Sequence, residues 1–227
     1  MGLYMKKISR KEESESNSMK SFPRFILASR SPRRCELLRE AGYRFDVIAP
    51  TVSEPTPNPD AKPVQLAQAA AYFKAKSVWE DHPDQIVLAA DTIVAVDGQI
   101  YGKPTDQADA RRILIALSGK RQAVITGVAI LFPDDQMQAP RRMIASETTY
   151  VTFKHLAIEE IERYIDSGQW KGKAGAYGIQ DPPSADEFVE SIEGSFTNVV
   201  GLPMELIERM FRTVEQQIKE KNDGLRR

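Results

Sequence analysis

The sequence contains few of the residues that build disulfide-linked or metal-centred folds. Cys35 is the one cysteine among 227 residues, and His82 and His155 are the two histidines. A lone cysteine excludes an internal disulfide framework and a zinc site made of several cysteines. We interpret Cys35 as a small packing residue, and the two widely separated histidines as surface residues rather than zinc ligands or members of a catalytic triad.

Long apolar runs and an excess of one charge are also lacking. No run approaches the roughly 20 apolar residues that span a bilayer, and the first residues lack the apolar core of a signal peptide. The 31 basic and 32 acidic residues give a formal net charge of -1, so the chain as a whole does not attract polyanions. We therefore expect a globular, cytoplasmic protein that binds neither nucleic acid nor membrane.

The common phosphate-binding signatures are missing as well. The sequence has no G-x-x-x-x-G-K-[ST] loop, and its short "TG" and "LSG" pairs do not make a dinucleotide fingerprint. Cys35 is not followed by an arginine six residues later, which excludes the cysteine-phosphatase loop. Any polyanion must therefore be bound by a local cluster of cations.

The order of the expected elements indicates one α/β domain. Residues 1–21 are polar and without apolar periodicity, so we expect a mobile extension followed by a single domain over residues 22–222. Apolar patterns predict strands at 24–28, 44–49, 85–104 (a hairpin), 121–132 and 142–155, and helices at 32–41, 64–81, 105–119, 157–168 and 203–218. We interpret 188–200 as further strands. Strands and helices alternate first and hairpins follow, which favours a mixed sheet with flanking helices.

The helix that begins at residue 32 has an unusual first turn. Ser31 suits the N-cap and Pro32 the first helical position, but Arg33 and Arg34 follow where the helix dipole disfavours cations. Both arginines could be solvated or paired with a carboxylate. Alternatively, free backbone N–H groups, the dipole and two guanidinium groups form an anion site that suits a phosphate.

Asp91 interrupts "IVLAADTIVAV", which is otherwise typical of a fully buried strand. A buried carboxylate needs a partner, and an ion pair with a nearby lysine is one interpretation. The other is a metal-phosphate site, because Thr92 follows directly and the hairpin returns Lys103 towards the same end of the sheet. Glu54, in a proline-rich loop, could supply a second carboxylate.

Five blocks of the sequence together resemble the Maf family of nucleoside triphosphate pyrophosphatases, in order and from about residue 24 to about residue 211. They are "LASRSPRRCELLREAG", "AADTIVAVDGQIYGKP", "LSGKRQAVITGVAI", "KAGAYGIQ" and "GSFTNVVGLP". The resemblance implies a fold similar to that of the inosine triphosphate pyrophosphatases, with a cleft between two lobes, and a homodimer. It also implies hydrolysis of a nucleoside triphosphate to the monophosphate and pyrophosphate with a divalent metal, Mg²⁺ or Mn²⁺.

The resemblance also implies roles for individual residues. Asp91 takes the position of the catalytic carboxylate, which activates water directly or through the metal, and Glu54 that of a second metal ligand. The expected triphosphate-binding residues are Ser29, Arg33, Arg34, Lys74 and Lys103.

The "YGIQ" form of the fourth block resembles the branch that acts on dTTP and UTP, with Gln180, Thr92 and Arg33 as the matching positions. The sequence departs from the family in the longer "DPPSADE" segment after Gln180, and in Gln122, where the family has histidine. The alternatives are therefore the same reaction on modified or non-canonical nucleotides, or a non-catalytic nucleotide-binding regulator of cell division.

Overall fold

A computed structural model describes residues 22–52, 61–134, 139–180 and 188–224 of the chain. The expected extension at 1–21 and Glu54 lie outside these residues. The described elements, in chain order, are β1 (Phe25–Ala28), α2 (Pro32–Glu40), β2 (Phe45–Ile48), α3 (Pro63–Trp79), β3 (Val87–Val96), β4 (Gln99–Tyr101), α4 (Gln107–Leu117), β5 (Arg121–Phe132), β6 (Arg141–Phe153), α5 (Ile158–Asp166), the 3-10 turn η1 (Ala174–Ala176), β7 (Val189–Glu193), α7 (Phe196–Val200) and α8 (Met204–Gly224).

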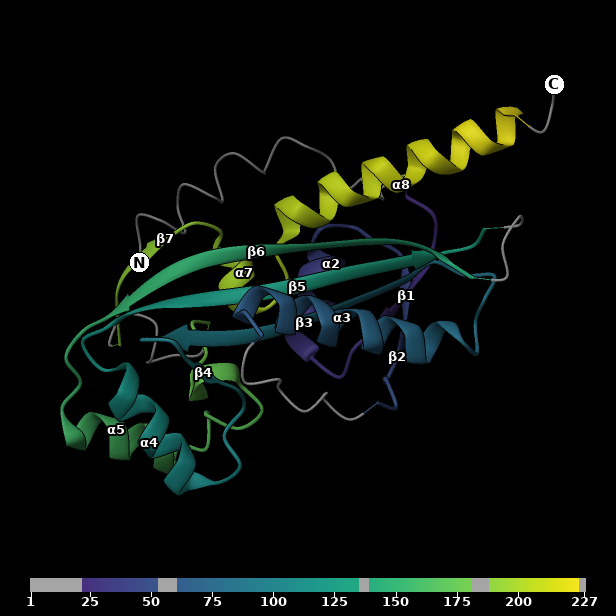
Figure 1. Cartoon of the computed structure of the whole chain (residues 1–227). Helices are drawn as coiled ribbons and strands as arrows, with labels where there is room; N and C mark the ends of the chain where they lie inside the picture. The colour runs from purple at the N-terminus through teal and green to yellow at the C-terminus, as the bar shows by residue number, and fades with distance from the viewer. Residues whose placement is uncertain (1–21, 53–60, 135–138, 181–187, 225–227) are drawn as a thin grey trace.

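One mixed sheet organises these elements (Figure 1). The strand order is β2-β1-β3-β5-β6-β7, with β4 paired to β3. The pairs β1–β2 and β1–β3 are parallel, whereas β3–β4, β3–β5, β5–β6 and β6–β7 are antiparallel. This confirms the predicted α/β fold with a mixed sheet. The parallel strands come from the alternating first part of the chain, and the antiparallel pairs come mainly from the hairpins that follow.

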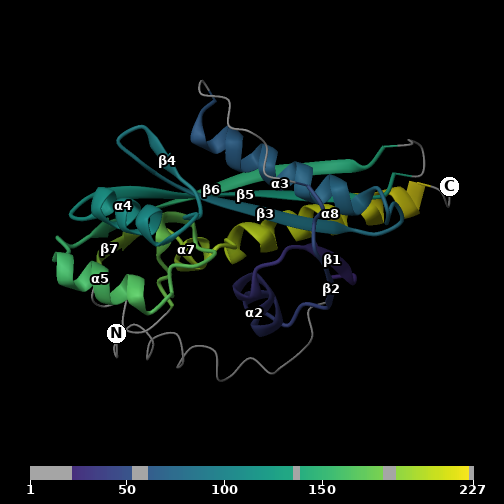
Figure 2. The ribbon, with the colours of Figure 1, turned by 90° about the horizontal axis from the view of Figure 1, so that it is seen from below.

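Helices cover both faces of the sheet, as Figure 2 shows with α3 on one side and α2 and α7 on the other. Alternate residues of β3 point to opposite faces. Val87 and Ala89 pack with Ala71 and Ala75 of α3, whereas Leu88 belongs to the larger core cluster on the other face. The chain thus has two apolar cores that share one sheet.

Part of one edge of β3 is not covered by another strand. β1 pairs with β3 at Val87 and Leu88, and β4 pairs with it from Val94 onwards. Among the described residues, the stretch between these contacts pairs with β5 alone. Asp91 and Thr92 lie in this open interval. Two lobes flank the sheet at β3, one formed by β1, β2 and α2 and the other by β4, α4 and α5 (Figures 1 and 2).

Gly127 brings α3 close to the sheet. It is the β5 partner of Asp91, and a Cβ atom at Gly127 would lie 2.2 Å from the carbonyl oxygen of Ala67 in α3. The backbone of α3 therefore packs directly on β5 at this point, which a side chain would prevent. The close packing fixes α3 above the strand that carries Asp91.

The predicted strands over 188–200 are only partly right. β7 ends at Glu193, and residues 196–200 form the short helix α7. Gly194 turns the chain with φ +125°, and the Ser195 hydroxyl then accepts a hydrogen bond from the N–H of Asn198 as an N-cap. The β-branched residues of "FTNVV" favoured a strand, but this cap begins a helix instead.

Candidate active site

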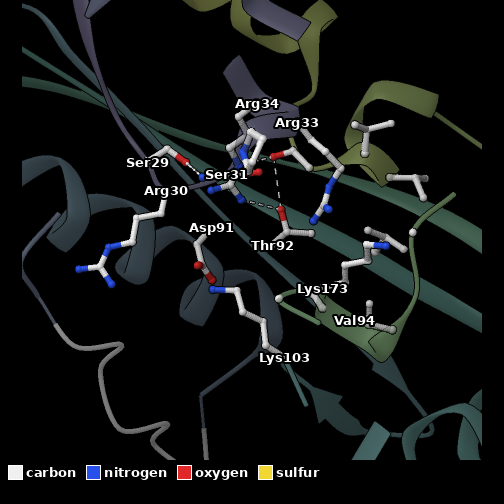
Figure 3. A pocket seen from close by; sticks show the side chains of 18 of the residues that line it. Ser29, Arg30, Ser31, Arg33, Arg34, Asp91, Thr92, Val94, Lys103 and Lys173 are labelled. Atoms are coloured by element: carbon white, nitrogen blue, oxygen red, sulfur yellow. Dashed lines mark hydrogen bonds between the residues drawn. The ribbon is translucent and has the colours of Figure 1, made fainter. Parts of the chain in front are cut away.

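A cavity of about 620 Å³ opens at the uncovered edge of β3, between the two lobes. Its walls come from the loop after β1, the first turn of α2, β3, the end of α7, and the glycine-rich segment 171–180 (Figure 3). Every residue that the sequence predicted for the site, and that the structure describes, lines it: Ser29, Arg33, Arg34, Lys74, Asp91, Thr92, Lys103 and Gln180. Residues up to 151 positions apart in the sequence therefore share one cavity, and their individual roles stay predictions.

The described lining is strongly cationic. It contains Arg30, Arg33, Arg34, Lys74, Lys103, Lys171 and Lys173, against the single carboxylate Asp91. The whole chain carries a formal net charge of -1. The fold has thus gathered positive charge at one place, which creates a local potential suited to a polyanion.

Asp91 forms an ion pair inside this cavity. Asp91 is 7% exposed. The Lys74 ammonium donates a hydrogen bond to Asp91 Oδ1, and both side chains are largely buried. Figure 3 shows the Lys103 side chain pointing to the same carboxylate. The sequence left an ion pair and a phosphate site as alternatives for Asp91, and the structure combines the ion pair with a place in the cationic cavity.

The loop before α2 presents backbone N–H groups and Arg33 to the cavity. The buried Ser29 hydroxyl accepts a hydrogen bond of 3.1 Å from the N–H of Ser31 and so shapes the loop. Ser31 makes no side-chain cap, and the first turn of α2 contains no acidic residue. The Arg33 side chain points into the cavity (Figure 3) and makes no hydrogen bond or ion pair with the described residues.

Arg34 differs from its neighbour because its guanidinium group binds the protein. Nε donates to the carbonyl of Gly201 at 2.7 Å, Nη1 to the carbonyl of Ala90 at 2.8 Å, and Nη2 to Thr92 Oγ1 at 3.1 Å. These three acceptors come from β3 and from the turn after α7. Arg34 therefore ties three distant parts of the chain together at the wall of the cavity.

A buried polar network continues from Thr92. Its hydroxyl lies 2.9 Å from the hydroxyl of Thr126, which lies 3.5 Å from the carbonyl of Asn198. The Asn198 amide in turn donates to the carbonyl of Val124 and to Thr149 Oγ1, both at 3.0 Å. Asn198, from the block "GSFTNVVGLP", thus holds α7 against β5 and β6.

The segment 171–180 forms the wall opposite α2. Gln180 is exposed at the end of this wall, whereas Tyr177 is buried and packs edge-on against Phe153. Burial raises the pKa of Tyr177 above its ordinary value, so its phenol stays neutral. Gly175 adopts φ +68°, and a Cβ there would lie 2.8 Å from Val94, so glycine allows the segment to pack on β3.

Sequence reasoning missed three cations of the cavity. Lys173 is only 6% exposed, which is rare for a lysine, and Lys171 and Arg30 also line the wall. The signal was present in "KGKAGAYGIQ" and "SRSPRR", since each cation lies within two residues of a predicted site block. Only the fold, however, shows that these positions face the cavity.

Gln122, the departure from the family's histidine, does not line the cavity. It is fully buried on β5, and neither polar atom of its amide has a hydrogen-bond partner within the described part of the chain. Any effect of this residue on base preference must therefore be indirect.

The described residues suit a metal that arrives with phosphate groups. No group of three or more histidine, cysteine, aspartate or glutamate side chains lies together among them. Mg²⁺ is commonly held by one or two carboxylates together with substrate phosphates rather than by a cage of protein ligands. Asp91 satisfies that minimum, and Glu54 lies outside the described residues.

The comparisons with known proteins agree on one family. A family model described as "Maf-like protein" matches residues 24–214. The chain is 45% identical over 179 residues to a protein of Symbiobacterium thermophilum, covering 79% of this chain and 88% of that protein. It is 46% identical over 181 residues to one of Thermosipho africanus, covering 80% and 88%, and 40% identical over 190 residues to one of Deinococcus radiodurans, covering 84% and 92%. Each of the three is named dTTP/UTP pyrophosphatase.

None of the helices that the structure describes has the length and apolar character to cross a bilayer.

Proposed function

Because this chain belongs to the family of Maf-like proteins, we propose that it is a nucleoside triphosphate pyrophosphatase that hydrolyses dTTP and UTP to the monophosphate and pyrophosphate. The names of its relatives, at 38–46% identity, support both the reaction and the two substrates. The observation that carries the proposal is the cavity itself, whose described lining contains seven cationic side chains and one buried carboxylate.

The charge of the substrate matches this arrangement. A nucleoside triphosphate carries about four negative charges near neutral pH, and cleavage of the α–β bond adds charge to the leaving pyrophosphate. Fixed cations in a cavity stabilise such developing charge without covalent chemistry. We assign this stabilisation to Arg33, Lys103 and the N–H groups at the start of α2. Lys74 and Ser29 complete the part of the cavity that binds the phosphates.

Asp91 is the residue we assign to the reacting centre. A water oxygen attacks the α-phosphorus and passes a proton to the Asp91 carboxylate, while the bond from that phosphorus to the bridging oxygen breaks and pyrophosphate leaves. Lys74 holds the carboxylate in one orientation through its ion pair, which limits the geometries the attacking water can adopt.

A divalent metal is the cofactor we propose, either Mg²⁺ or Mn²⁺. When bound with the triphosphate it supplies Lewis-acid neutralisation of the phosphate charge. Asp91 is the described residue that would hold it, and Glu54 is its predicted partner.

The pyrimidine base is assigned to the wall that ends at Gln180. An amide offers one donor and one acceptor, as the edge of thymine or uracil does. Thr92 and Arg33 are the other two positions that resemble the dTTP and UTP branch.

The remaining proposals concern the whole protein. We expect residues 22–222 to act as one catalytic domain, with 1–21 as an extension, in a cytoplasmic homodimer that binds no nucleic acid. The lone cysteine and the balanced charge support the compartment and the lack of nucleic-acid binding.

A product assay tests the proposed reaction. Purified protein with Mg²⁺ is incubated with dTTP, UTP, CTP, GTP and methylated nucleotides, and pyrophosphate is measured separately from phosphate. We expect pyrophosphate from dTTP and UTP, a loss of at least about 100-fold in Asp91→Asn, and no loss in the matched control Asp84→Asn, which is exposed and outside the cavity.

Other outcomes separate the alternatives. Pyrophosphate from other nucleotides only would reject the base assignment and keep the reaction. Release of phosphate instead of pyrophosphate would indicate a phosphatase, and nucleotide binding without turnover would favour the non-catalytic regulator.

A further inference from the structure

Arg34 supplies a hydrogen-bond donor to the uncovered edge of β3. Strand edges present unpaired backbone groups, and a buried carbonyl without a partner is costly. Beyond Leu88, β1 no longer pairs with β3, so within the described part of the chain the carbonyl of Ala90 has no strand partner on that side. Arg34 Nη1 donates to this carbonyl at 2.8 Å and takes the place of a neighbouring strand.

The same guanidinium group fixes two further points around the cavity. Nε binds the carbonyl of Gly201, where the chain leaves α7, and Nη2 binds the Thr92 hydroxyl. Ala90 and Thr92 are the two neighbours of Asp91 in the strand. Arg34 therefore holds the backbone on one side of Asp91 and the side chain on the other.

Arg34 also determines how the Thr92 hydroxyl group points. Because Nη2 donates to Thr92 Oγ1, the hydroxyl proton must be directed elsewhere. The available acceptors are Thr126 Oγ1 at 2.9 Å and the carbonyl of Gly201 at 3.4 Å, and both lie in the protein. Because Thr126 donates its own proton to the carbonyl of Asn198, the Thr92 proton points to Thr126 Oγ1 and one lone pair of Thr92 Oγ1 remains, so Thr92 offers the cavity an acceptor and no donor.

We propose that Arg34 is a positioning residue of this site, which closes the open edge of β3 and holds Asp91 and the Thr92 acceptor in place, rather than a ligand of the triphosphate. The proposal rests on the proposed function and gives the two adjacent arginines different tasks. Arg33 faces the substrate, and Arg34 acts through the protein.

A charge-conserving substitution separates the two tasks. Lysine can replace arginine as a point charge beside a phosphate, but it cannot donate along three fixed directions. For Arg34→Lys we expect kcat to fall about 100-fold with KM changed less than about threefold, as for a displaced reacting group. For the matched variant Arg33→Lys we expect the reverse pattern, a raised KM with kcat nearly kept. A raised KM with an unchanged kcat in Arg34→Lys would overturn the proposal.

A second variant tests the proposal if Arg34→Lys does not fold. Thr92→Val keeps the shape of the side chain and removes the acceptor, so the preference for UTP, whose base carries an N3–H donor, over CTP should fall about tenfold. An unchanged UTP to CTP ratio would contradict the acceptor that Arg34 is proposed to set.

A measurement without turnover keeps this inference separate from the proposed function. In ¹⁵N-labelled wild-type protein, the Arg34 Nε–H should exchange slowly with solvent and keep its resonance when inorganic pyrophosphate is added, while the Arg33 Nε–H resonance moves. Rapid exchange of the Arg34 proton, or an equal shift of both resonances, would overturn the positioning role even if the enzyme releases pyrophosphate. Slow exchange without any pyrophosphate release would support it while the proposed function fails.

Discussion

Two neighbouring residues that break the same sequence rule can have different partners in the folded protein. The helix dipole makes Arg33 and Arg34 equally unfavourable in the first turn of α2. Successive side chains on a helix point about 100° apart, so Arg33 enters the cavity while Arg34 reaches β3 and Gly201. Lys74 and Lys76 differ in the same way on α3, because Lys74 pairs with Asp91 and Lys76 pairs with Glu80 at the surface.

The two lysines of α3 provide a matched stability test. In Lys74→Met the Asp91 carboxylate loses its partner in a place with little water, so we expect the free energy of unfolding to fall by about 3 kcal/mol. In Lys76→Met an exposed i, i+4 pair is lost, and the change should stay within about 0.5 kcal/mol. Urea unfolding measures both values, and equal losses in the two variants would show that the Asp91 pair contributes no more than a surface pair.

Gln180 provides a test of base preference. Gln180→Ala removes the amide assigned to the thymine or uracil edge, so the relative kcat/KM for dTTP, UTP and CTP should change by about tenfold. The rate of pyrophosphate release from the best substrate should change less. Gln85→Ala, an exposed residue outside the cavity, is the control. A proportional loss on all substrates would remove Gln180 from base recognition.

At the scale of elements, close packing places the chemistry. Gly127 allows α3 to lie on β5 directly opposite Asp91, and Gly175 allows the segment 171–180 to lie on β3 at Val94. Near the two ends of the described chain, Phe25 and Tyr43 contact Phe211 of α8 through their rings, which holds the last helix against β1 and the turn between α2 and β2. Each of these contacts joins segments that are far apart in the sequence.

The contact of α3 with β5 predicts the effect of one methyl group. In Gly127→Ala the new Cβ meets the backbone of Ala67, which cannot move without shifting α3, so we expect a loss of about 3 kcal/mol in stability. Activity should fall as well because α3 carries Lys74. Gly102→Ala, which has open space around it, should leave thermal stability nearly unchanged. A stable Gly127→Ala protein would contradict the tight helix-to-sheet packing.

The aromatic contact with α8 predicts how stability depends on alkaline pH. Burial, with a smaller contribution from Glu208, raises the pKa of Tyr43 to about 12, whereas the unfolded chain releases this proton near pH 10. Its contribution to stability is therefore complete below pH 10 and is lost as the pH rises through 12. Tyr43→Phe should reduce the slope of unfolding free energy between these values by up to about 1 kcal/mol per pH unit. Identical slopes in the wild type and the variant would mean that the Tyr43 hydroxyl is more exposed to water than it is in this structure.

At the scale of the whole molecule, a nearly neutral chain separates its charges. The cationic lining of the cavity is balanced by acidic residues elsewhere, since the formal net charge is -1. The lining comes from both lobes and from both faces of the sheet, so the positive field exists only in the folded chain.

This charge separation predicts a salt effect on binding. Screening becomes stronger as the Debye length falls from about 14 Å near 0.05 M to about 4 Å near 0.5 M salt. We expect KM for dTTP to rise several-fold over this range with a much smaller change in kcat, and Lys103→Gln should flatten the dependence. A salt-independent KM would show that the cations of the cavity do not attract the triphosphate from solution.

The sequence alone determined much of this protein. Patterns of period two and 3.6 predicted the mixed α/β fold, and the five blocks predicted residues that line one cavity. The elements were readable because helix starts, buried strands and glycine turns are local properties of the chain, whereas the site residues followed from the resemblance to the Maf family. The strand predicted at 196–200 was wrong, since a serine cap outweighed β-branched residues there.

The tertiary structure decided which partner each charged residue finds. Three features depend on segments up to 167 positions apart that meet at one strand. Lys74 pairs with Asp91, Arg34 closes the edge of β3, and Lys173 faces the cavity. Hydrogen bonds and ion pairs form over a few ångströms, and distances of that kind between remote residues are set by how the sheet is ordered and how closely the helices pack on it.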